Sequence, residues 1–309
     1  MSGRFAPSPT GDLHLGNLRT ALAAWLAARS TGRGFIVRME DLDRSTSSPD
    51  HEARQLADLR SLGIDWDGAV VRQSERFAIY RAAIQRLQAE GLVYPCFCTR
   101  REIRAEIEAA PRAPHVHLPD GAYPGTCRDL SEAERAARER AGRRPAWRLR
   151  TNGEVIELVD GIAGPFSGAV DDVVLARADG VPAYNLAVVV DDADQAVTQV
   201  LRGDDLLSST PRQMYLQRLL GLPHPEYLHV PLVLGEDEQR LAKRHGAVTL
   251  ADLAAAGWRA GEVLAALAAS LGLARRGESV TIDQLVGRFD PACVPRTPVH
   301  LSDLQRSTA

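Results

Sequence analysis

The first seventeen residues are the feature that most constrains the fold. A short apolar strand leads into a loop rich in Pro, Ser, Thr and Gly, and a helical pattern follows. The apolar positions of this pattern are Leu15, Leu18, Leu22, Trp25 and Leu26. Free backbone N–H groups and the positive end of a helix dipole make such a junction a natural phosphate site. Gly16 has no side chain, so a ligand can lie close to the backbone there. The plainer interpretation is a polar turn with Asp12 as helix cap and a solvated His14.

Composition limits the class of protein. The chain has 309 residues, of which 45% are hydrophobic and 25% charged, so it is an ordinary globular chain with room for two or three domains. No apolar run approaches the roughly 20 residues that span a bilayer, and no signal segment is evident, so we expect a cytoplasmic protein without a membrane partner. A net charge of −3 requires local basic patches for any nucleic-acid partner.

Alternating strand and helix patterns predict an α/β fold with a parallel, doubly wound sheet. Residues 94–180 break this alternation, and we interpret them as an irregular insertion between two halves of the sheet. The expected strands are 35–40, 172–176, 184–190, 197–201 and 229–234, with 184–190 as a central strand because it is continuously apolar. The expected helices are 49–62, 77–90, 131–142, 210–220, 250–256 and 262–271.

Three of the four cysteines fall in the insertion, at positions Cys96, Cys98 and Cys127. In a cytosolic chain such a cluster indicates a metal site rather than disulfides. Three thiolates are one ligand short of a tetrahedral structural zinc site, which His115, His117 or Tyr123 could complete. Chemistry alone favours a histidine.

Residues 4–17 resemble the nucleotide-binding signature of class I aminoacyl-tRNA synthetases, in the form found in the glutamate branch. There an Arg-Phe-Ala-Pro-Ser-Pro-Thr-Gly run precedes His-x-Gly-x, as it does here. Residues 235–246 resemble the second signature, a Lys-x-Ser-Lys-x loop, with Lys243 on the central lysine and Ala242 where the family usually has Ser. The resemblance implies catalytic roles for His14 and Lys243. It implies that Mg²⁺ accompanies ATP. The ATP-binding residues that it implies are Pro7, Ser8, Pro9, Thr10, Gly11, His14, Gly16, Asn17, Arg240 and Lys243.

The chemistry of a glutamate substrate requires a guanidinium for the side-chain carboxylate and an anion for the ammonium group. Arg4, Arg202 and Glu40 meet this need, because they lie at expected strand ends or beside the first loop. The alternative for Arg202 is a surface salt bridge with Asp204 or Asp205. The glutamate-binding set implied by the resemblance is Arg4, Phe5, Ala6, Pro7, Ser8, Glu40, Tyr184 and Arg202.

The Tyr-x-Gly-x-Cys run after Cys-x-Cys matches a subgroup related to glutamyl-tRNA synthetase, in which tyrosine is the fourth zinc ligand. The resemblance thus implies one structural Zn²⁺ on Cys96, Cys98, Tyr123 and Cys127. Only about 65 residues follow the Lys243 loop, less than a typical domain. The chain therefore looks like a truncated paralogue that lacks the anticodon-reading region.

The implied fold is a Rossmann-type doubly wound parallel sheet with an inserted zinc-containing acceptor-type subdomain and a small C-terminal helical region. Residues 1–92 and 181–235 would form the two halves of the catalytic domain, 93–180 the insertion, and 236–309 the catalytic Lys loop and the helical region. The implied activity is tRNA-independent activation of L-glutamate with ATP to glutamyl-adenylate. The glutamyl group would then pass to the queuosine base in the anticodon of tRNA(Asp).

Two alternatives remain open at this stage. One is a short glutamyl-tRNA synthetase that charges tRNA(Glu), and the other is a noncatalytic paralogue that binds amino acid or RNA. Basic residues near and beyond the cysteines can hold an RNA backbone, although most charged helices are simply solvated. These residues are Arg100, Arg101, Arg104, Arg135, Arg138, Arg140, Arg143 and Arg144.

Overall fold

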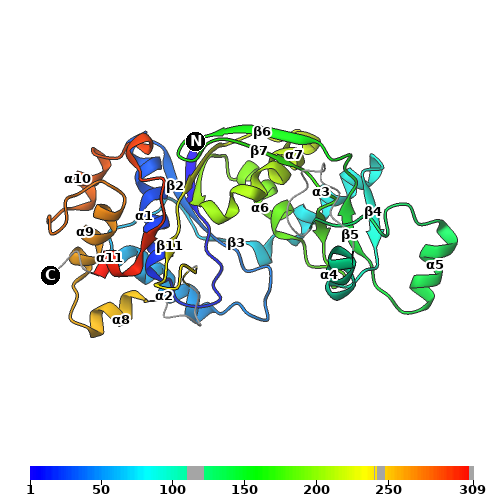
Figure 1. The fold of residues 1–309 in the computed structure, drawn as a ribbon, viewed down its shortest axis with the longest axis horizontal. Coiled ribbons are helices and arrows are strands. Elements are labelled where there is room, and N and C mark those ends of the chain that lie inside the picture. Colours follow the sequence, from blue (N-terminus) through cyan, green and yellow to red (C-terminus); the bar gives the residue numbers. More distant parts are fainter. Residues whose placement is uncertain (110–121, 240, 242–247, 306–309) are drawn as a thin grey trace.

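A five-stranded parallel sheet with the order β10-β9-β1-β2-β3 forms the centre of the molecule (Figure 1). The computed structural model describes residues 1–109, 122–239, 241 and 248–305. The strands are β1 (Ser2–Phe5), β2 (Gly34–Met39), β3 (Val71–Arg72), β9 (Val197–Gly203) and β10 (Glu226–Val230). Strand order runs outward in both directions from β1, so a crevice opens at the carboxyl ends of β1 and β9. The parallel Rossmann-like sheet is as the sequence predicts.

The helices that flank this sheet begin and end where local signals place them. They are α1 (Leu15–Ser30), α2 (Pro49–Ser61), α3 (Phe77–Ala89), α6 (Tyr184–Asp194) and α7 (Thr210–Leu220). The Ser48 side chain accepts the Asp50 N–H, and Pro49 occupies the first helical position. At the other end of a helix, Gly221 stops α7 in a left-handed conformation with φ 62°.

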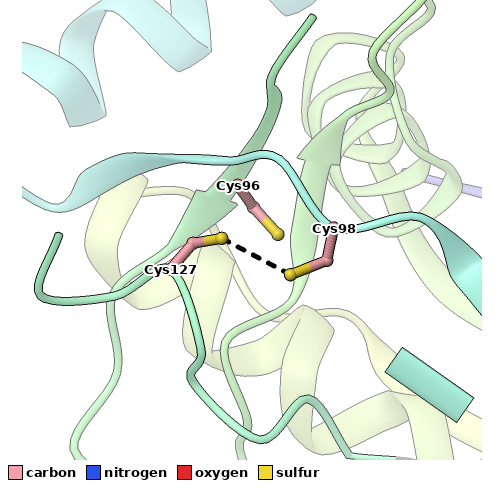
Figure 2. Close-up of side chains that lie close together, drawn as sticks. All are labelled: Cys96, Cys98 and Cys127. Atoms are coloured by element: carbon pink, nitrogen blue, oxygen red, sulfur yellow. Dashed lines mark hydrogen bonds between the residues drawn. The ribbon is translucent and has the colours of Figure 1, made fainter. Parts of the chain in front are cut away.

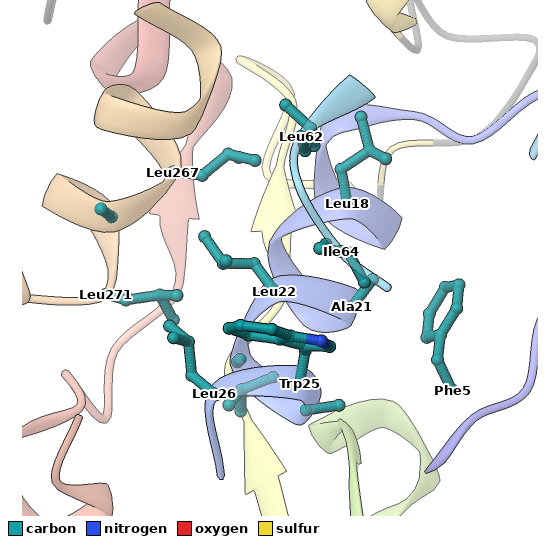
Figure 3. Packing of buried hydrophobic residues seen from close by; sticks show 14 of the residues in the cluster. Phe5, Leu18, Ala21, Leu22, Trp25, Leu26, Leu62, Ile64, Leu267 and Leu271 are labelled. Atoms are coloured by element: carbon teal, nitrogen blue, oxygen red, sulfur yellow. The ribbon is translucent and has the colours of Figure 1, made fainter. Parts of the chain in front are cut away.

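Helix α1 is the centre of the largest hydrophobic cluster (Figure 3). Leu18, Leu22 and Leu26 are each 0% exposed. Phe5 of β1 packs on one side of the helix, and Leu267 and Leu271 pack on the other. A helix that is apolar nearly all round is a buried helix, and here it is enclosed between the sheet and the C-terminal helices.

The C-terminal region lies at one end of the molecule and is joined to the sheet through Arg19 (Figure 1). This arginine of α1 is 1% exposed, and it donates to the Pro231 carbonyl at 2.7 Å and to the Ser270 hydroxyl at 3.0 Å. The region contains α8 (Leu250–Ala255), α9 (Ala260–Ser270), α10 (Ile282–Val286), α11 (Leu301–Gln305) and the parallel pair β11 (Val233–Leu234) and β12 (Val299–His300). The two expected helices of this region are confirmed.

Residues 94–180 are far more regular than expected. The helix expected at 131–142 and the strand expected at 172–176 are confirmed, but the expectation of an otherwise irregular segment is wrong. The segment contains a large part of an antiparallel sheet of β4 (Val93–Cys96), β5 (Ala146–Leu149) and β8 (Val174–Ala176), and the hairpin of β6 (Val155–Asp160) and β7 (Gly164–Ala169). The described part of the segment also contains the helices α4 (Arg100–Ala109) and α5 (Glu132–Arg140). In Figure 1, β4, β5, α4 and α5 lie at the opposite end from the C-terminal helices, whereas β6 and β7 run over the middle of the molecule. Strands β4, β5 and β8 have only three or four residues, too few to show a clear period.

The expected central strand at 184–190 is also wrong, because these residues begin helix α6. Periodicity cannot distinguish a buried strand from a helix that packs on several sides, and Leu186 and Val189 are both buried against α3 and α7. The expected strand at 229–234 is divided into β10 and β11. Pro231 follows β10 directly, and proline has no N–H to continue a ladder.

Short 3₁₀ turns connect some of the remaining segments in the described part of the chain. They are η1 (Gln73–Glu75), η2 (Asp204–Ser209) and η3 (Pro291–Cys293). Among the described residues, no helix is both long and apolar enough to cross a membrane.

The close approach of β1 to α1 gives a stability prediction. A Cβ at Gly3 would lie 2.9 Å from the Ala28 Cβ, so Gly3→Ala must push the central strand away from its helix. We expect the free energy of unfolding to fall by about 1–3 kcal/mol in urea denaturation. Gly261→Ala is the matched control, because nothing lies within 4 Å of a Cβ at that helical position. It should leave stability unchanged or raise it by up to about 1 kcal/mol, and equal losses in both variants would contradict the packing argument.

Candidate active site

A cleft of about 680 Å³ opens at the carboxyl ends of β1 and β9. It brings together most of the residues that the sequence singles out: Arg4, Phe5, Ala6, Pro7, Ser8, Thr10, Gly11, His14, Gly16, Asn17, Glu40, Tyr184 and Arg202. Pro9 does not line the cleft, and its carbonyl accepts the Ser48 N–H instead. Arg240, Ala242 and Lys243 lie outside the described residues, although Leu241 between them lines the cleft.

The loop before α1 is held by reciprocal hydrogen bonds between His14 and Asn17. The His14 ring accepts the Asn17 N–H at 3.3 Å, and the Asn17 side chain accepts the His14 N–H at 3.2 Å. His14 is therefore the helix cap, and the interpretation that assigned this role to Asp12 is wrong. A Cβ at Gly16 would lie 3.0 Å from the His14 ring, so a side chain there would displace the histidine.

Gln55 of α2 is a site residue that sequence reasoning missed. It is 1% exposed, and its amide donates to the carbonyls of Ser8 at 3.1 Å and Gly11 at 2.6 Å. These two bonds fix the loop between β1 and α1 from behind, so the shape of this loop depends on α2. No local signal marks Gln55, because its partners lie more than forty residues earlier in the chain.

Arg202, near the end of β9, is buried with only 4% of its surface exposed, yet it lines the cleft. Its Nε donates to the His229 ring at 3.0 Å, and its Nη2 donates to the Thr210 hydroxyl at 3.0 Å and the Leu206 carbonyl at 3.4 Å. Nη1 lies 3.5 Å from the Tyr184 hydroxyl. The surface salt bridge considered for Arg202 is thus wrong, because the guanidinium is buried among these groups.

A network of buried charges lies beneath the cleft. Arg38 of β2 is 0% exposed, and its Nη1 donates to Asp192 at 2.8 Å while Nη2 lies 3.5 Å from Glu40. Asp192 also pairs with Arg4 at 3.5 Å. Burial raises the pKa of Glu40 above its usual value, although Arg38 and Arg4 act in the opposite direction. A cationic group in the cleft would therefore favour the ionised form of Glu40.

Asp191, beside Asp192 on α6, anchors the same network from its other side. Its carboxylate accepts from Gln73 at 2.8 Å, from Arg76 at 2.8 Å and from the Tyr80 hydroxyl at 2.8 Å. Helix α6 therefore presents two adjacent carboxylates to the sheet and to α3. The sequence pattern gives no sign of this role, because both aspartates directly follow the run 184–190 that we expect to be a strand, and the expectation does not continue the element through them.

Cys96, Cys98 and Cys127 lie together at the far end from the C-terminal helices (Figure 2). Their sulfur atoms all lie within 4.8 Å of one another. The Tyr123 hydroxyl lies 3.3 Å from the Cys96 Sγ and 3.6 Å from the Cys98 Sγ. Burial raises the pKa of Cys98 to about 12, so a cation is needed to keep such a group deprotonated. His115 and His117 lie outside the described residues.

A second cleft, of about 750 Å³, connects the first one to the cysteine cluster. Both clefts share the wall residues Ser8, Thr10, Glu40 and Tyr184. Cys96, Cys98 and Arg100 line the opposite part of the second cleft. A molecule in the second cleft would thus reach the first cleft beside Glu40.

Most of the predicted basic residues lie on the two helices near this end. Arg101 and Arg104 of α4 are exposed, whereas Arg143 pairs with Glu102 at 2.8 Å. Helix α5 mixes its arginines with Glu132, Glu134 and Glu139, so its charges largely balance. Of these arginines, Arg100 lines the second cleft.

Comparisons with known proteins agree with this geometry. Residues 1–286 match the family model for the catalytic domain of class I tRNA synthetases (E and Q). A glutamyl-Q tRNA(Asp) synthetase of Nocardia farcinica is 61% identical over 98% of this chain and 93% of its own length. A glutamyl-Q tRNA(Asp) synthetase of Symbiobacterium thermophilum is 52% identical over 97% of this chain and 96% of its own length. A crystal structure of a glutamate tRNA ligase from Elizabethkingia meningosepticum in complex with its amino acid superposes with a TM-score of 0.82 at 28% identity, covering 99% of this chain and 68% of that one.

The buried network gives a prediction about stability and pH. Burial raises the pKa of Asp192, but Arg38 and Arg4 lower it further, so the folded value lies below the usual one. Its contribution to stability is therefore present above pH ~4 and is lost as the pH falls through the folded pKa. Asp192→Asn should lower the free energy of unfolding by about 3–5 kcal/mol at pH 7 and make its decline below pH 4 shallower.

Asp129→Asn is the control for this measurement. The Asp129 side chain is 81% exposed and pairs with Arg150 at the surface, so its loss should cost no more than about 1 kcal/mol. Denaturant titrations of both variants across the acid range check the prediction. An unchanged pH slope in Asp192→Asn would show that the buried pair does not contribute to the acid sensitivity.

Proposed function

The chain belongs to the glutamyl-Q tRNA(Asp) synthetases, within the class I family for glutamate and glutamine, and from this premise we propose its reaction and site residues. It activates L-glutamate with ATP, without tRNA, to give glutamyl-adenylate and pyrophosphate. It then transfers the glutamyl group to the queuosine base in the anticodon of tRNA(Asp), in the cytoplasm. We also propose the division of the chain into domains given above. Residues 1–92 and 181–235 form the two halves of the catalytic domain, 93–180 the insertion, and 236–309 the Lys loop and the helical region.

The observation that carries the glutamate assignment is the environment of Arg202. This buried guanidinium lines the cleft, and within the described part of the chain its hydrogen bonds go to neutral groups only. A buried cation needs an anionic partner, which the side-chain carboxylate of glutamate provides. Glu40 lies on the same cleft and supplies the negative charge for the ammonium group.

The remaining glutamate contacts follow from the lining of the cleft. Arg4 is fixed by Asp192, and Tyr184 stands beside Arg202. We assign glutamate binding to Arg4, Phe5, Ala6, Pro7, Ser8, Glu40, Tyr184 and Arg202. The class I fold and the shared lining support this set.

ATP binding is assigned to the loop before α1 and to the Lys243 loop. The start of α1 favours phosphate because of its backbone N–H groups and helix dipole, and Gly16 has no side chain that would displace His14 there. The set is Pro7, Ser8, Pro9, Thr10, Gly11, His14, Gly16, Asn17, Arg240 and Lys243, with Mg²⁺ accompanying the nucleotide. Lys243 would stabilise charge at the α-phosphate as carboxylate displaces pyrophosphate, and Lys243→Ala should abolish that step.

The second cleft is the path by which we propose the tRNA reaches the adenylate. A hydroxyl of the queuosine base attacks the glutamyl carbonyl carbon and forms an ester. The anhydride bond between that carbon and the phosphate oxygen breaks, AMP leaves, and the hydroxyl proton is released to solvent. Arg100 lines this cleft, and Arg101 and Arg104 are exposed on the same helix, so all three can contact the RNA backbone. Such contacts should weaken as the salt concentration rises.

One structural Zn²⁺ on Cys96, Cys98, Tyr123 and Cys127 completes the proposal. Three sulfurs and one phenol oxygen in a compact group match the number of ligands that a structural zinc takes. Burial and the contacts with the cysteine thiols raise the pKa of Tyr123, so, as for Cys98, a bound cation would be needed to keep the phenol deprotonated. Because Cys96 and Cys98 also line the second cleft, the metal would fix the wall that the acceptor meets.

The glutamate assignment predicts that Arg202→Lys binds glutamate poorly, because lysine lacks the planar fork that pairs with a carboxylate. In glutamate-dependent exchange between ATP and pyrophosphate, KM for glutamate should rise about tenfold or more while KM for ATP stays constant. Arg259→Lys is the matched control, since its side chain is 83% exposed in the C-terminal region. An unchanged KM for glutamate in Arg202→Lys would remove Arg202 from the site.

The zinc proposal predicts one zinc ion per chain by elemental analysis of the purified protein. Cys127→Ser should lose most of the metal, and Tyr123→Phe should bind it more weakly, because each removes one of the ligands. Cys293→Ser is the matched control, since Cys293 is exposed and lies apart from the cluster. Full zinc occupancy in Tyr123→Phe at limiting free zinc would indicate a different fourth ligand, such as His115 or His117.

Transfer of labelled glutamate tests the acceptor. Purified protein with ATP and magnesium should label queuosine-containing tRNA(Asp), but neither unmodified tRNA(Asp) nor tRNA(Glu). Labelling of tRNA(Glu) instead would identify a short glutamyl-tRNA synthetase. An absence of both labelling and exchange would identify a noncatalytic paralogue.

A further inference from the structure

The buried contacts of Arg202 continue into a second layer behind the cleft. Arg202 Nε donates to His229 Nε2 at 3.0 Å, and His229 Nδ1 lies 2.6 Å from Asp160 Oδ2. The side chains of His229 and Asp160 are both 0% exposed. The three residues come from β9, β10 and the end of β6, so the row of contacts joins the central sheet to the inserted hairpin.

This arrangement fixes the tautomer of His229. A guanidinium Nε–H can only donate, so His229 Nε2 carries no proton and accepts. The single ring proton is then on Nδ1, where the Asp160 carboxylate accepts it. Burial lowers the pKa of His229, and the adjacent Arg202 cation acts in the same direction, which keeps the ring neutral.

Asp160 is itself held so that only one of its oxygens is directed at the ring. Its Oδ1 accepts backbone N–H groups from Ile162 at 3.0 Å, Ala163 at 2.8 Å and His229 at 3.0 Å. Burial raises the pKa of Asp160, but these bonds and the one from the His229 ring lower it further, so the carboxylate stays ionised. The backbone thus positions Asp160, Asp160 positions His229, and His229 positions Arg202.

We propose that Asp160 and His229 are positioning residues that orient Arg202 toward the side-chain carboxylate of the amino-acid substrate. The inference rests on the proposed activation of glutamate. A neutral ring between the carboxylate and the guanidinium holds Arg202 without pairing its charge directly. Thr210 and the Leu206 carbonyl hold Nη2, so the Nη1 side beside Tyr184 is the one that meets the substrate.

The row of contacts from Asp160 through His229 to Arg202 is called the relay below. Asp160→Asn tests it with little change in the shape of the side chain. The amide oxygen can keep the backbone bonds, but the amide N–H₂ faces His229 Nδ1 and forces the ring proton onto Nε2, opposite the Arg202 donor. In exchange between ATP and pyrophosphate, KM for glutamate should rise about tenfold or more, while KM for ATP stays within about twofold. A KM for glutamate within about twofold of the wild type would overturn the proposal.

Two substitutions at His229 keep the test valid if Asp160→Asn fails to fold. His229→Leu removes the acceptor, so KM for glutamate should rise about tenfold or more. His229→Gln restores an acceptor oxygen and should return KM to within about threefold of the wild type. Equal effects of the two substitutions would overturn the proposal, because a purely structural role would not distinguish an acceptor from an apolar group.

Nitrogen-15 NMR of labelled histidine separates this inference from the proposed function. The relay requires that the wild-type His229 proton be on Nδ1, and in Asp160→Asn it should move to Nε2. A wild-type proton on Nε2 would overturn the relay even if exchange were active. A wild type without exchange activity would contradict the proposed reaction. The positioning role would still stand if His229 had the expected tautomer and calorimetry showed glutamate binding that Asp160→Asn weakens.

Discussion

The buried pairing of Arg38 with Asp191 and Asp192 is the interaction on which the site depends. It joins the second strand of the sheet to helix α6, and through Asp192 it also fixes Arg4 on the central strand. Removing one member of such a group leaves a charge without compensation in a dry environment, which costs more than the group contributes when complete. The site is therefore rigid for a reason that lies one layer below the cleft. Glu40, which faces the cleft, takes its electrostatic environment from the same group.

Local signals in the sequence were sufficient for the loop before α1, the capped helices and the parallel sheet. They succeeded because a cap, a proline or a periodic apolar face acts within a few residues of itself. They failed at 184–190, where an apolar run is buried on several sides, and in the short strands of the insertion. The resemblance supplied the glutamate and ATP residues, and the cleft brings most of them together.

The supporting residues could not be predicted, because their partners are distant in sequence. Asp160 and His229 are sixty-nine positions apart, and Arg38 and Asp192 are 154 apart. Neither pair belongs to a motif with fixed spacing, and a buried histidine or aspartate alone has no distinctive pattern. The assignments of Arg240 and Lys243 remain predictions from sequence, since both lie outside the described residues.

The central position of β1 has a consequence for how the protein is made. Ser2 and Gly3 pair with Gly34 and Phe35 on one side, and with Val197 and Gln199 on the other. Strand β1 is synthesised nearly two hundred residues before β9, so one of its edges stays uncovered over that length of synthesis. Pairings between residues so far apart form slowly, and exposed strand edges are prone to misassociation. The nascent chain is thus most vulnerable during synthesis of the insertion, before β9 has been translated.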